Sequence, residues 1–344
     1  MYRIAAIFVL SFVPACLAQS EWSQWRGSYD GAGIIEGGPL ITEWSETKNV
    51  IWKSPVPGRG ASSPIIAGSK LFLTTADDEA GQQFLLCYDR NSGELQWQKL
   101  VFEGEFLVPS HRLNTEATPT PVTDGKIVVT LFGINGGQSL AAFDLEGEPL
   151  WTTRVAEIDS WFGIGASPVL YKGKVIVLND IPPTNFVAAY DLRTGELIWK
   201  TIRPGDPDNY HENHNYQTPR VFRLEERDQL VTTGLGEMAS YDPDTGQALW
   251  KTEGGARASV GSPVAGHDLI YFSGGFPETG TFAFNGKTKQ LEWTNRLATY
   301  IVSNVLHGDY LYGSNNRGEF ACMDAKTGDI LWRNLFREEV LASP

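Results

Sequence analysis

Cysteine, methionine and histidine are scarce in this sequence, and positive charge is outnumbered. The 344 residues include three Cys, three Met and five His, and 28 Lys and Arg stand against 41 Asp and Glu, for a formal net charge of −13. An acidic excess of this size argues against a nucleic-acid-binding protein, which needs a basic contact surface. Charged residues make up only 20% of the chain beside 42% hydrophobic residues, and this composition excludes a disordered protein.

Long hydrophobic runs are also missing, except for one at the N-terminus. Arg3 is followed by an apolar stretch, 4–13, and by a small-residue exit that ends at Ala18. This stretch is shorter than the roughly 20 residues of a membrane span and matches a secretory signal peptide. We therefore expect residues 1–18 to be a signal peptide, the protein to be periplasmic or extracellular, and no transmembrane span. Lipid attachment at Cys16 is the alternative, because residues 13–16 loosely resemble a lipobox.

The two cysteines that follow this leader occupy equivalent places in the sequence. Cys87 and Cys322 each stand two residues before an acidic turn residue, Asp89 and Asp324. No Cys-x-x-Cys pair is present, so the sequence contains no thiol-based metal signature. We expect two buried strand cysteines that are not paired with each other.

Tryptophan, with 11 residues, is the informative abundance. Seven tryptophans recur at intervals of 39 to 54 residues: Trp52, Trp97, Trp151, Trp199, Trp250, Trp293 and Trp332. Repeats of about 40 to 50 residues that contain short strands are typical of β-propeller blades. We expect the tryptophans to be structural docking residues, each at the end of a fourth strand.

Each repeat contains the signals of four short strands. A Ser-Pro or Thr-Pro step precedes the first strand in five repeats, and Ser303-Asn304 takes its place in the sixth. A glycine-containing hairpin, a β-branched run and an Asp-x-x-Thr-Gly turn follow, in which Asp can accept from the turn backbone and Gly tolerates positive φ. The turn before Trp293 is the least regular, because Lys289 replaces its glycine. These signals predict an all-β propeller of four-stranded antiparallel blades.

The repeat also resembles a known motif. The pattern Ala-x-Asp-x-x-Thr-Gly-x-x-x-Trp, as in 189–199, resembles the tryptophan-docking motif of the pyrroloquinoline quinone (PQQ)-like repeat propellers. Residues 22–27, Trp-Ser-Gln-Trp-Arg-Gly, are similar to the start of exported BamB-like proteins with these repeats. The resemblance extends over about residues 22–344 and implies the propeller fold. The superfamily includes quinoprotein alcohol dehydrogenases and the outer-membrane assembly scaffold BamB, so the fold alone does not assign an activity.

The repeats predict three regions in the chain. Residues 1–18 form the signal peptide, residues 19–48 lead into the propeller, and residues 49–344 contain the repeats. Six repeats are complete, whereas related propellers have seven or eight blades, and residues 49–53 resemble the closing strand of a final blade. We therefore expect a C-terminally incomplete sequence from a protein with seven or eight blades.

Polar and aromatic residues concentrate in the loops that lead into the Ser-Pro strands. In a propeller these loops lie at one mouth of the channel, where convergent side chains form a candidate binding site. The candidates for a ligand or partner face are Arg59, His111, Arg112, Asn114, Trp161, His211, His214, Arg257 and Tyr300. His267 and His307 belong to hairpins of the opposite face and are expected to be exposed.

The densest part of these loops, 209–216, contains the weak metal candidates His211, Glu212 and His214. Imidazole nitrogens suit zinc or copper, but a polar surface loop explains the same residues. We expect no resident metal here and no bound cofactor.

Three functions follow from these features. The first is an exported, noncatalytic binding or protein-interaction scaffold, BamB-like, whose partners are other exported or envelope proteins. The second, implied by the resemblance, is a dehydrogenase that uses PQQ and Ca²⁺, with oxygen donors such as Asn114 and Glu116. Family enzymes are longer and carry an adjacent Cys-Cys pair that this chain lacks. The third is a hydrolase that uses the His- and Glu-rich channel mouth. The scaffold needs only the fold and an exposed face, and it is the function we predict.

Overall fold

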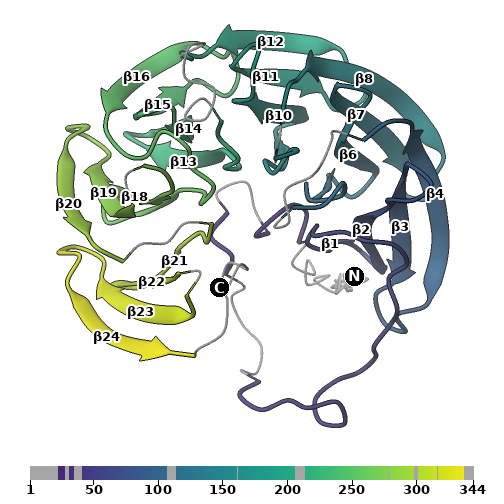
Figure 1. Ribbon diagram of the computed structural model, residues 1–344, viewed down its shortest axis with the longest axis horizontal. Coiled ribbons are helices and arrows are strands. Elements are labelled where there is room, and N and C mark those ends of the chain that lie inside the picture. Colours follow the sequence, from purple (N-terminus) through teal and green to yellow (C-terminus); the bar gives the residue numbers. More distant parts are fainter. Residues whose placement is uncertain are drawn as a thin grey trace, which may run out of the picture.

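The computed structural model contains a ring of antiparallel sheets around a central channel (Figure 1). It describes residues 22–27, 31–34, 41–106, 114–160, 162–205, 214–277, 279–297, 301–315 and 317–336. The leader and Cys16 lie outside these residues. Within them the only regular secondary structure is β, and no helix capable of crossing a membrane occurs.

Each of the six sheets is a blade of four strands that are consecutive in the chain. Blade 1 contains β1 (Ile65–Ala67), β2 (Lys70–Asp77), β3 (Gln82–Asp89) and β4 (Leu95–Glu103). Blade 2 contains β5 (Val122–Thr123), β6 (Ile127–Ile134), β7 (Gly137–Asp144) and β8 (Pro149–Glu157). Blade 3 contains β9 (Val169–Tyr171), β10 (Lys174–Asn179), β11 (Phe186–Asp191) and β12 (Leu197–Ile202). Blade 4 contains β13 (Arg220–Leu224), β14 (Arg227–Gly234), β15 (Glu237–Tyr241) and β16 (Ala248–Glu253). Blade 5 contains β17 (Val264–Gly266), β18 (Leu269–Gly274), β19 (Gly280–Asn285) and β20 (Leu291–Asn295). Blade 6 contains β21 (Val305–His307), β22 (Tyr310–Ser314), β23 (Glu319–Asp324) and β24 (Ile330–Leu335).

The first strand of every blade lies nearest the channel and the fourth lies at the periphery (Figure 1). This alternation separates the loops onto two faces. The hairpin face carries the first hairpin of each blade and the Asp-containing turns. The mouth face carries the loops between second and third strands and the loops between blades. The exposed hairpin positions of His267 and His307 confirm the expectation for these two residues.

The tryptophans lie near the start of the fourth strands, so the expectation that they end these strands is wrong. Trp97 is the third residue of β4, and the hairpin register places it opposite Cys87. Trp199 lies opposite Ala189, and Trp332 opposite Cys322. A small residue on the third strand thus faces each indole, and it explains the small position of the repeat.

Several indoles dock onto the next blade through their N–H, whereas that of Trp250 donates to Gln229 of its own blade. The indole nitrogen of Trp151 donates to the carbonyl of Leu192 at 3.1 Å, and that of Trp293 to Ala325 at 3.1 Å. Each acceptor directly follows the Asp of the next blade's turn. Trp52, which precedes blade 1, docks in the same way onto Arg90 of that blade at 3.0 Å. The indole N–H groups at these junctions therefore join neighbouring blades.

The turn glycine is required on two grounds. Gly246 has a φ of +75°, and a Cβ built there would lie 2.4 Å from the Trp199 ring. Lys289, which replaces this glycine in blade 5, keeps a φ of +62°. Its ammonium lies 4.8 Å from the centre of the Trp250 ring, so a cation–π contact substitutes for the close glycine approach. The irregular turn therefore keeps the same geometry.

The hydrophobic core is divided among the blade junctions. Five clusters of buried side chains each combine residues of two neighbouring blades, for example Ile176 and Trp199 of blade 3 with Leu230 of blade 4. Inner strands that lie between two such clusters are buried on both faces, as in β6, where every residue after Ile127 is buried. Cys87 and Cys322 are buried and not disulfide-bonded, which confirms the expectation for them.

Blade 6 differs from the other blades on its outer face. Between β24 and blade 1 the described residues contain no further strand, and residues 41–60 cross this part of the ring (Figure 1). The Trp332 side chain is 46% exposed, whereas Trp199 is 8% exposed. Phe320 and Tyr312 flank Trp332 with ring centres at 5.8 and 6.3 Å. The prediction of a propeller with six complete repeats is confirmed.

Candidate functional site

A belt of hydroxyl groups lies where the interblade loops enter the first strands. The backbone N–H of each Ser or Thr in the Ser-Pro step donates to the hydroxyl of its counterpart in the following blade. The five bonds are 2.9–3.0 Å long and connect Ser63, Thr120, Ser167, Thr218, Ser262 and Ser303. We call these six residues the hydroxyl belt. It holds the start of each first strand at a fixed position below the mouth face.

Two of the predicted mouth residues lie together in blades 1 to 3. Arg59 donates from Nη2 to the carbonyl of Asn114 at 3.1 Å and lies 3.5 Å from the Asp78 carboxylate. The Asn114 amide donates to the carbonyls of Phe162 and Ile164 at 2.6 and 3.2 Å. The polar groups of Arg59 and Asn114 that could bind a ligand are therefore hydrogen-bonded to neighbouring loops.

His214 lies inside an aromatic cluster. Its ring stacks on Tyr216 with centres 6.1 Å apart, and the edge of Phe162 approaches it at 6.0 Å. Only 1% of His214 is exposed. Neither a partner face nor a polar surface loop, the two roles expected from the sequence, describes this buried residue. The aromatic neighbours account for the difference, because they remove the imidazole from water.

Arg257 lies on the adjoining part of the mouth, and its side chain is exposed. Its carbonyl accepts from the backbone N–H of Leu235 at 2.6 Å, and the N–H of Tyr216 donates to Ser259 at 2.8 Å. The loops that carry Asn114, His214 and Arg257 thus form one connected arc. The other candidates of the sequence lie outside the described residues: His111, Arg112, Trp161, His211, Glu212 and Tyr300.

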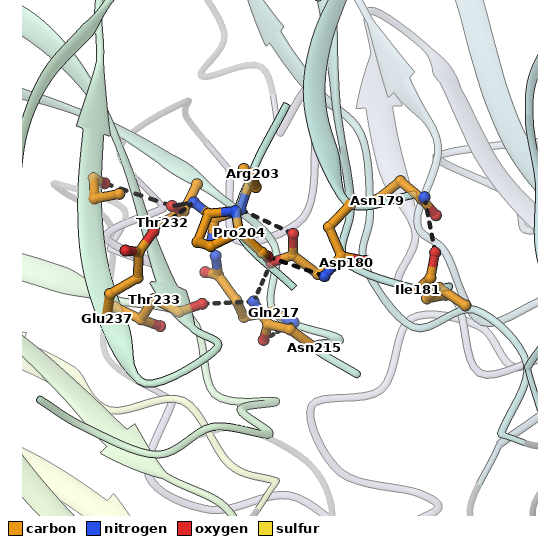
Figure 2. A network of polar contacts seen from close by, with 12 residues as sticks. Asn179, Asp180, Ile181, Arg203, Pro204, Asn215, Gln217, Thr232, Thr233 and Glu237 are labelled. Atoms are coloured by element: carbon orange, nitrogen blue, oxygen red, sulfur yellow. Dashed lines mark hydrogen bonds and ion pairs between the residues drawn. The ribbon is translucent and has the colours of Figure 1, made fainter. Parts of the chain in front are cut away.

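A buried ion pair anchors this arc to blades 3 and 4 (Figure 2). Arg203, which follows β12, donates from Nε to Asp180 at 2.8 Å, and both side chains are fully buried. Asn215 donates to the other carboxylate oxygen of Asp180 at 2.9 Å. Nη1 of Arg203 donates to Thr232 at 2.6 Å and to Tyr241 at 2.8 Å. The network fixes the loop that contains Asn215 against two blades.

Electrostatics keep Arg203 charged in this setting. Burial alone would lower the pKa of its guanidinium, but the facing Asp180 carboxylate, together with the Tyr241 hydroxyl, holds that pKa above its usual value. The charge is therefore compensated inside the protein. It is not displayed toward the channel mouth.

The described part of the mouth contains no ready set of side-chain ligands for Ca²⁺. Calcium takes six to eight oxygen ligands, and among the described residues no three His, Cys, Asp or Glu side chains cluster to hold a metal. The Asn114 amide oxygen accepts from Thr118, Asp180 is bonded to Arg203, and Glu116 is buried. The candidate donors of this part of the mouth are thus used internally or withdrawn from it.

The channel itself holds the N-terminal segment 22–27, in the centre of the ring (Figure 1). The carbonyl of Trp22 accepts from Ile66 of β1 at 2.8 Å, and that of Ser23 from Thr123 of β5 at 2.9 Å. The side-chain oxygen of Gln24 accepts from Leu170 of β9 at 2.8 Å. A segment expected only to lead into the propeller therefore crosses three inner strands.

The same segment reaches the far side of the channel. Arg26 donates to the carbonyl of Asn304 in blade 6 at 2.8 Å, and burial lowers the pKa of its guanidinium to about 10. The guanidinium of Arg220 lies 4.5 Å from the centre of the Trp25 ring. These contacts join residues up to 278 positions apart, and no local pattern encodes them. The sequence reveals the motif but not its place in the channel.

Comparisons with known proteins agree with this architecture. The sequence profile of the family described as outer membrane protein assembly factor BamB matches residues 23–101 and 81–334. The BamB of Burkholderia pseudomallei (strain K96243) is 22% identical over 249 residues, which are 69% of this chain and 56% of that protein. Quinohemoprotein alcohol dehydrogenase ADH IIB of Pseudomonas putida is 28% identical over 166 residues, 44% of this chain and 24% of the enzyme. The chain thus spans about half and about a quarter of the lengths of these relatives.

Solved structures show the same fold. BamB from Moraxella catarrhalis aligns with a TM-score of 0.57 and 16% identity, over 81% of this chain and 76% of that one. A europium-containing methanol dehydrogenase aligns with a TM-score of 0.53 and 12% identity, over 94% and 87%. At these identities the likeness concerns the fold alone. The family profile, which spans most of the repeats, goes further: this chain belongs to the family described as outer membrane protein assembly factor BamB, with PQQ-like propeller repeats.

Proposed function

We propose that this protein is an exported, noncatalytic propeller that binds another protein of the cell envelope and serves as a scaffold. The name of its family and the BamB relative from Burkholderia pseudomallei support a role in outer membrane protein assembly. The N-terminal signal-peptide pattern supports export.

The observation that carries the proposal is the internal use of polar groups at the mouth. Asn114 braces two loops, and Asp180 neutralises Arg203 inside the protein. Catalysis needs groups directed at a substrate with suitable protonation states. Groups saturated by neighbouring loops give rigidity to a surface, which is what a scaffold requires.

The periphery offers a surface for such binding. The outer strand β12 exposes Leu197, Ile198 and Ile202, although it belongs to a well-packed blade. An outer strand is also a sheet edge, whose backbone groups can pair with an extended segment of a partner. We therefore expect the partner to contact the periphery of blade 3.

A photo-crosslinking residue at position 198 tests this contact in the envelope of the native host. We expect a defined conjugate with one envelope protein from this position, and none from Lys326, an exposed turn residue used as the control. Conjugates that are the same from both positions, or absent from position 198, would contradict the scaffold contact.

The dehydrogenase alternative is supported by the 28% identity to ADH IIB. A titration distinguishes it from the scaffold function. The purified protein receives PQQ and Ca²⁺ with an alcohol and a redox dye, while Trp fluorescence is followed. We expect neither saturable quenching nor dye reduction. Dye reduction would overturn the noncatalytic assignment, and a bound metal with hydrolytic turnover would point to the hydrolase instead.

A further inference from the structure

A hollow of about 530 Å³ opens on the hairpin face at blades 4, 5 and 6. It is lined by the inner strands β13, β17 and β21 and by the N-terminal segment at Ile34. The volume lies within the range of pockets that bind small ligands or short peptide segments. The hollow is separate from the mouth loops and from the outer strand β12.

The other half of the channel shows what such inner strands can bind. Ile66, Thr123 and Leu170 each stand three residues after a member of the hydroxyl belt. In an antiparallel hairpin, alternate residues direct their backbone groups away from the neighbouring strand. The N–H groups of these three residues point into the channel, where consecutive residues of 22–24 accept from them.

The same position in blades 4 to 6 is taken by Val221, Ala265 and Leu306. Across the first hairpin of each blade they stand opposite Leu230, Ile270 and Leu311, as Ile66 stands opposite Leu71 in blade 1. All three line the hollow. No described residue accepts from their backbone N–H groups. One half of the channel is thus occupied by an extended segment, while the equivalent groups of the other half line the hollow and have no acceptor among the described residues.

The surroundings of these backbone groups favour an extended peptide. The walls are apolar at Val264, Leu269 and Leu306. The charges at the rim are paired, since Lys287 lies 2.8 Å from Asp268 and Arg223 lies 3.2 Å from Asp228. Recognition here would depend on backbone bonds and apolar contact, with little selection by charge.

We propose that this hollow binds an extended peptide segment of another protein, which crosses β13, β17 and β21 as residues 22–24 cross β1, β5 and β9. Consecutive acceptors of that segment take the N–H groups of Val221, Ala265 and Leu306, and its side chains fill the apolar walls. The inference rests on the proposed binding function and adds a second site to it, distinct from β12.

A peptide with the sequence of residues 22–25, blocked at both ends and carrying a fluorophore, is the probe, because this sequence already fits the equivalent strands. Its binding to the full chain is followed by fluorescence anisotropy. Ala265→Pro removes the central N–H at a position where an inner edge strand tolerates proline. Ala265→Val keeps the N–H with a similar volume and is the matched control.

We expect saturable binding that Ala265→Pro weakens about three- to tenfold, the loss of one hydrogen bond, while Ala265→Val changes it less than about twofold. Hydrogen exchange on the unaltered protein gives a second readout, in which the peptide should protect the amides of Val221, Ala265 and Leu306. This readout remains informative if the proline variant does not fold.

Three outcomes would overturn the proposal: no saturation, equal weakening by both variants, or protection that appears at Ile66, Thr123 and Leu170 instead. Formation of dimers without peptide would assign the hollow to a second copy of the chain and would also overturn it. None of these results depends on crosslinking from position 198 or on quinone turnover, so this site can fail while the scaffold function stands.

Discussion

Trp199 and Trp332 occupy the same place in two copies of one motif, yet their surroundings differ. Both lie near the start of a fourth strand, opposite a small residue of the third strand. Trp199 is buried against Gly246 of blade 4, and its indole donates to Pro243 at 3.3 Å. Trp332 is half exposed, and the aromatic rings that flank it, Tyr312 and Phe320, belong to its own blade.

The difference separates what a repeat encodes from what its neighbour contributes. The motif forms the strand, the turn and the placement of the indole within one blade. Burial of the indole comes from the turn of the next blade. The same motif residues therefore contribute more to stability at the junction of blades 3 and 4 than at the outer face of blade 6.

The largest expected effect is the loss of the buried indole. Trp199→Ala should lower the free energy of unfolding by about 4 kcal/mol, because it removes a large side chain from a packed junction. Trp332→Ala should lower it by less than about 1 kcal/mol. Urea denaturation followed by circular dichroism measures both variants. Equal losses would mean that the face of blade 6 is as well covered as the junction.

The buried ion pair of Asp180 and Arg203 allows a second comparison of the packed junction with an exposed site. Asp180→Asn leaves Arg203 without its countercharge in the core of the junction, and we expect a loss of about 3 kcal/mol. Asp268→Asn, which breaks an exposed pair with Lys287 at 2.8 Å, is the control and should cost less than about 0.5 kcal/mol. A double variant with Arg203→Met should recover part of the loss. If Asp180→Asn matches its control in urea midpoint, the pair does not stabilise the junction.

A pH series tests the hairpin side of this junction. The hydroxyl of Tyr171 and the ammonium of Lys172 donate to Asp228 at 2.7 and 3.0 Å and lower the pKa of its carboxyl to about 2. Because this pKa is below the unfolded value, the stabilisation is complete above about pH 4 and is lost as the pH falls toward 2. Asp228→Asn should cost about 1–2 kcal/mol near neutrality and almost nothing near pH 2. A cost that does not change with pH would contradict the linkage.

The smallest effect concerns the irregular step of blade 6. Asn304 stands where five repeats have proline, and its buried side-chain amide has no hydrogen-bond partner among the described residues. Asn304→Pro should raise the free energy of unfolding by about 1 kcal/mol, because it removes that amide and restricts the unfolded chain. The reverse change, Pro263→Asn in blade 5, should lower it by a similar amount. Thermal melting of both variants checks the two signs.

The blades could be predicted from the sequence because their signals are local. The interval from the turn Asp to the Trp, the glycine with positive φ and the small residue opposite the indole all belong to one hairpin. Even the irregular turn with Lys289 keeps its geometry. Burial of Cys87 and Cys322 follows from the same hairpin register.

The site was harder to predict because its contacts join distant parts of the chain. His214 looks like a surface ligand among polar neighbours, and only the rings of Phe162 and Tyr216 show that it is buried. The pair of Asp180 and Arg203 unites ends of two strands, and the place of Trp22 depends on Ile66 of another region. The charged and aromatic side chains of these residues identify them as candidates in the sequence, but their contact partners are too distant in the chain for a local pattern to predict.

The hydroxyl belt gives the ring a direction. Thr120, Ser167, Thr218 and Ser262 each donate the backbone N–H to the following blade and accept at the hydroxyl from the preceding one, so successive blades are joined head to tail by a heterologous contact. Such a contact can form with any following blade that carries the Ser or Thr hydroxyl. A blade added by duplication could therefore form the same hydrogen bond with the blades on both sides, and the loss of a blade would leave two compatible neighbours. The number of blades can thus vary in evolution without a new type of contact between blades.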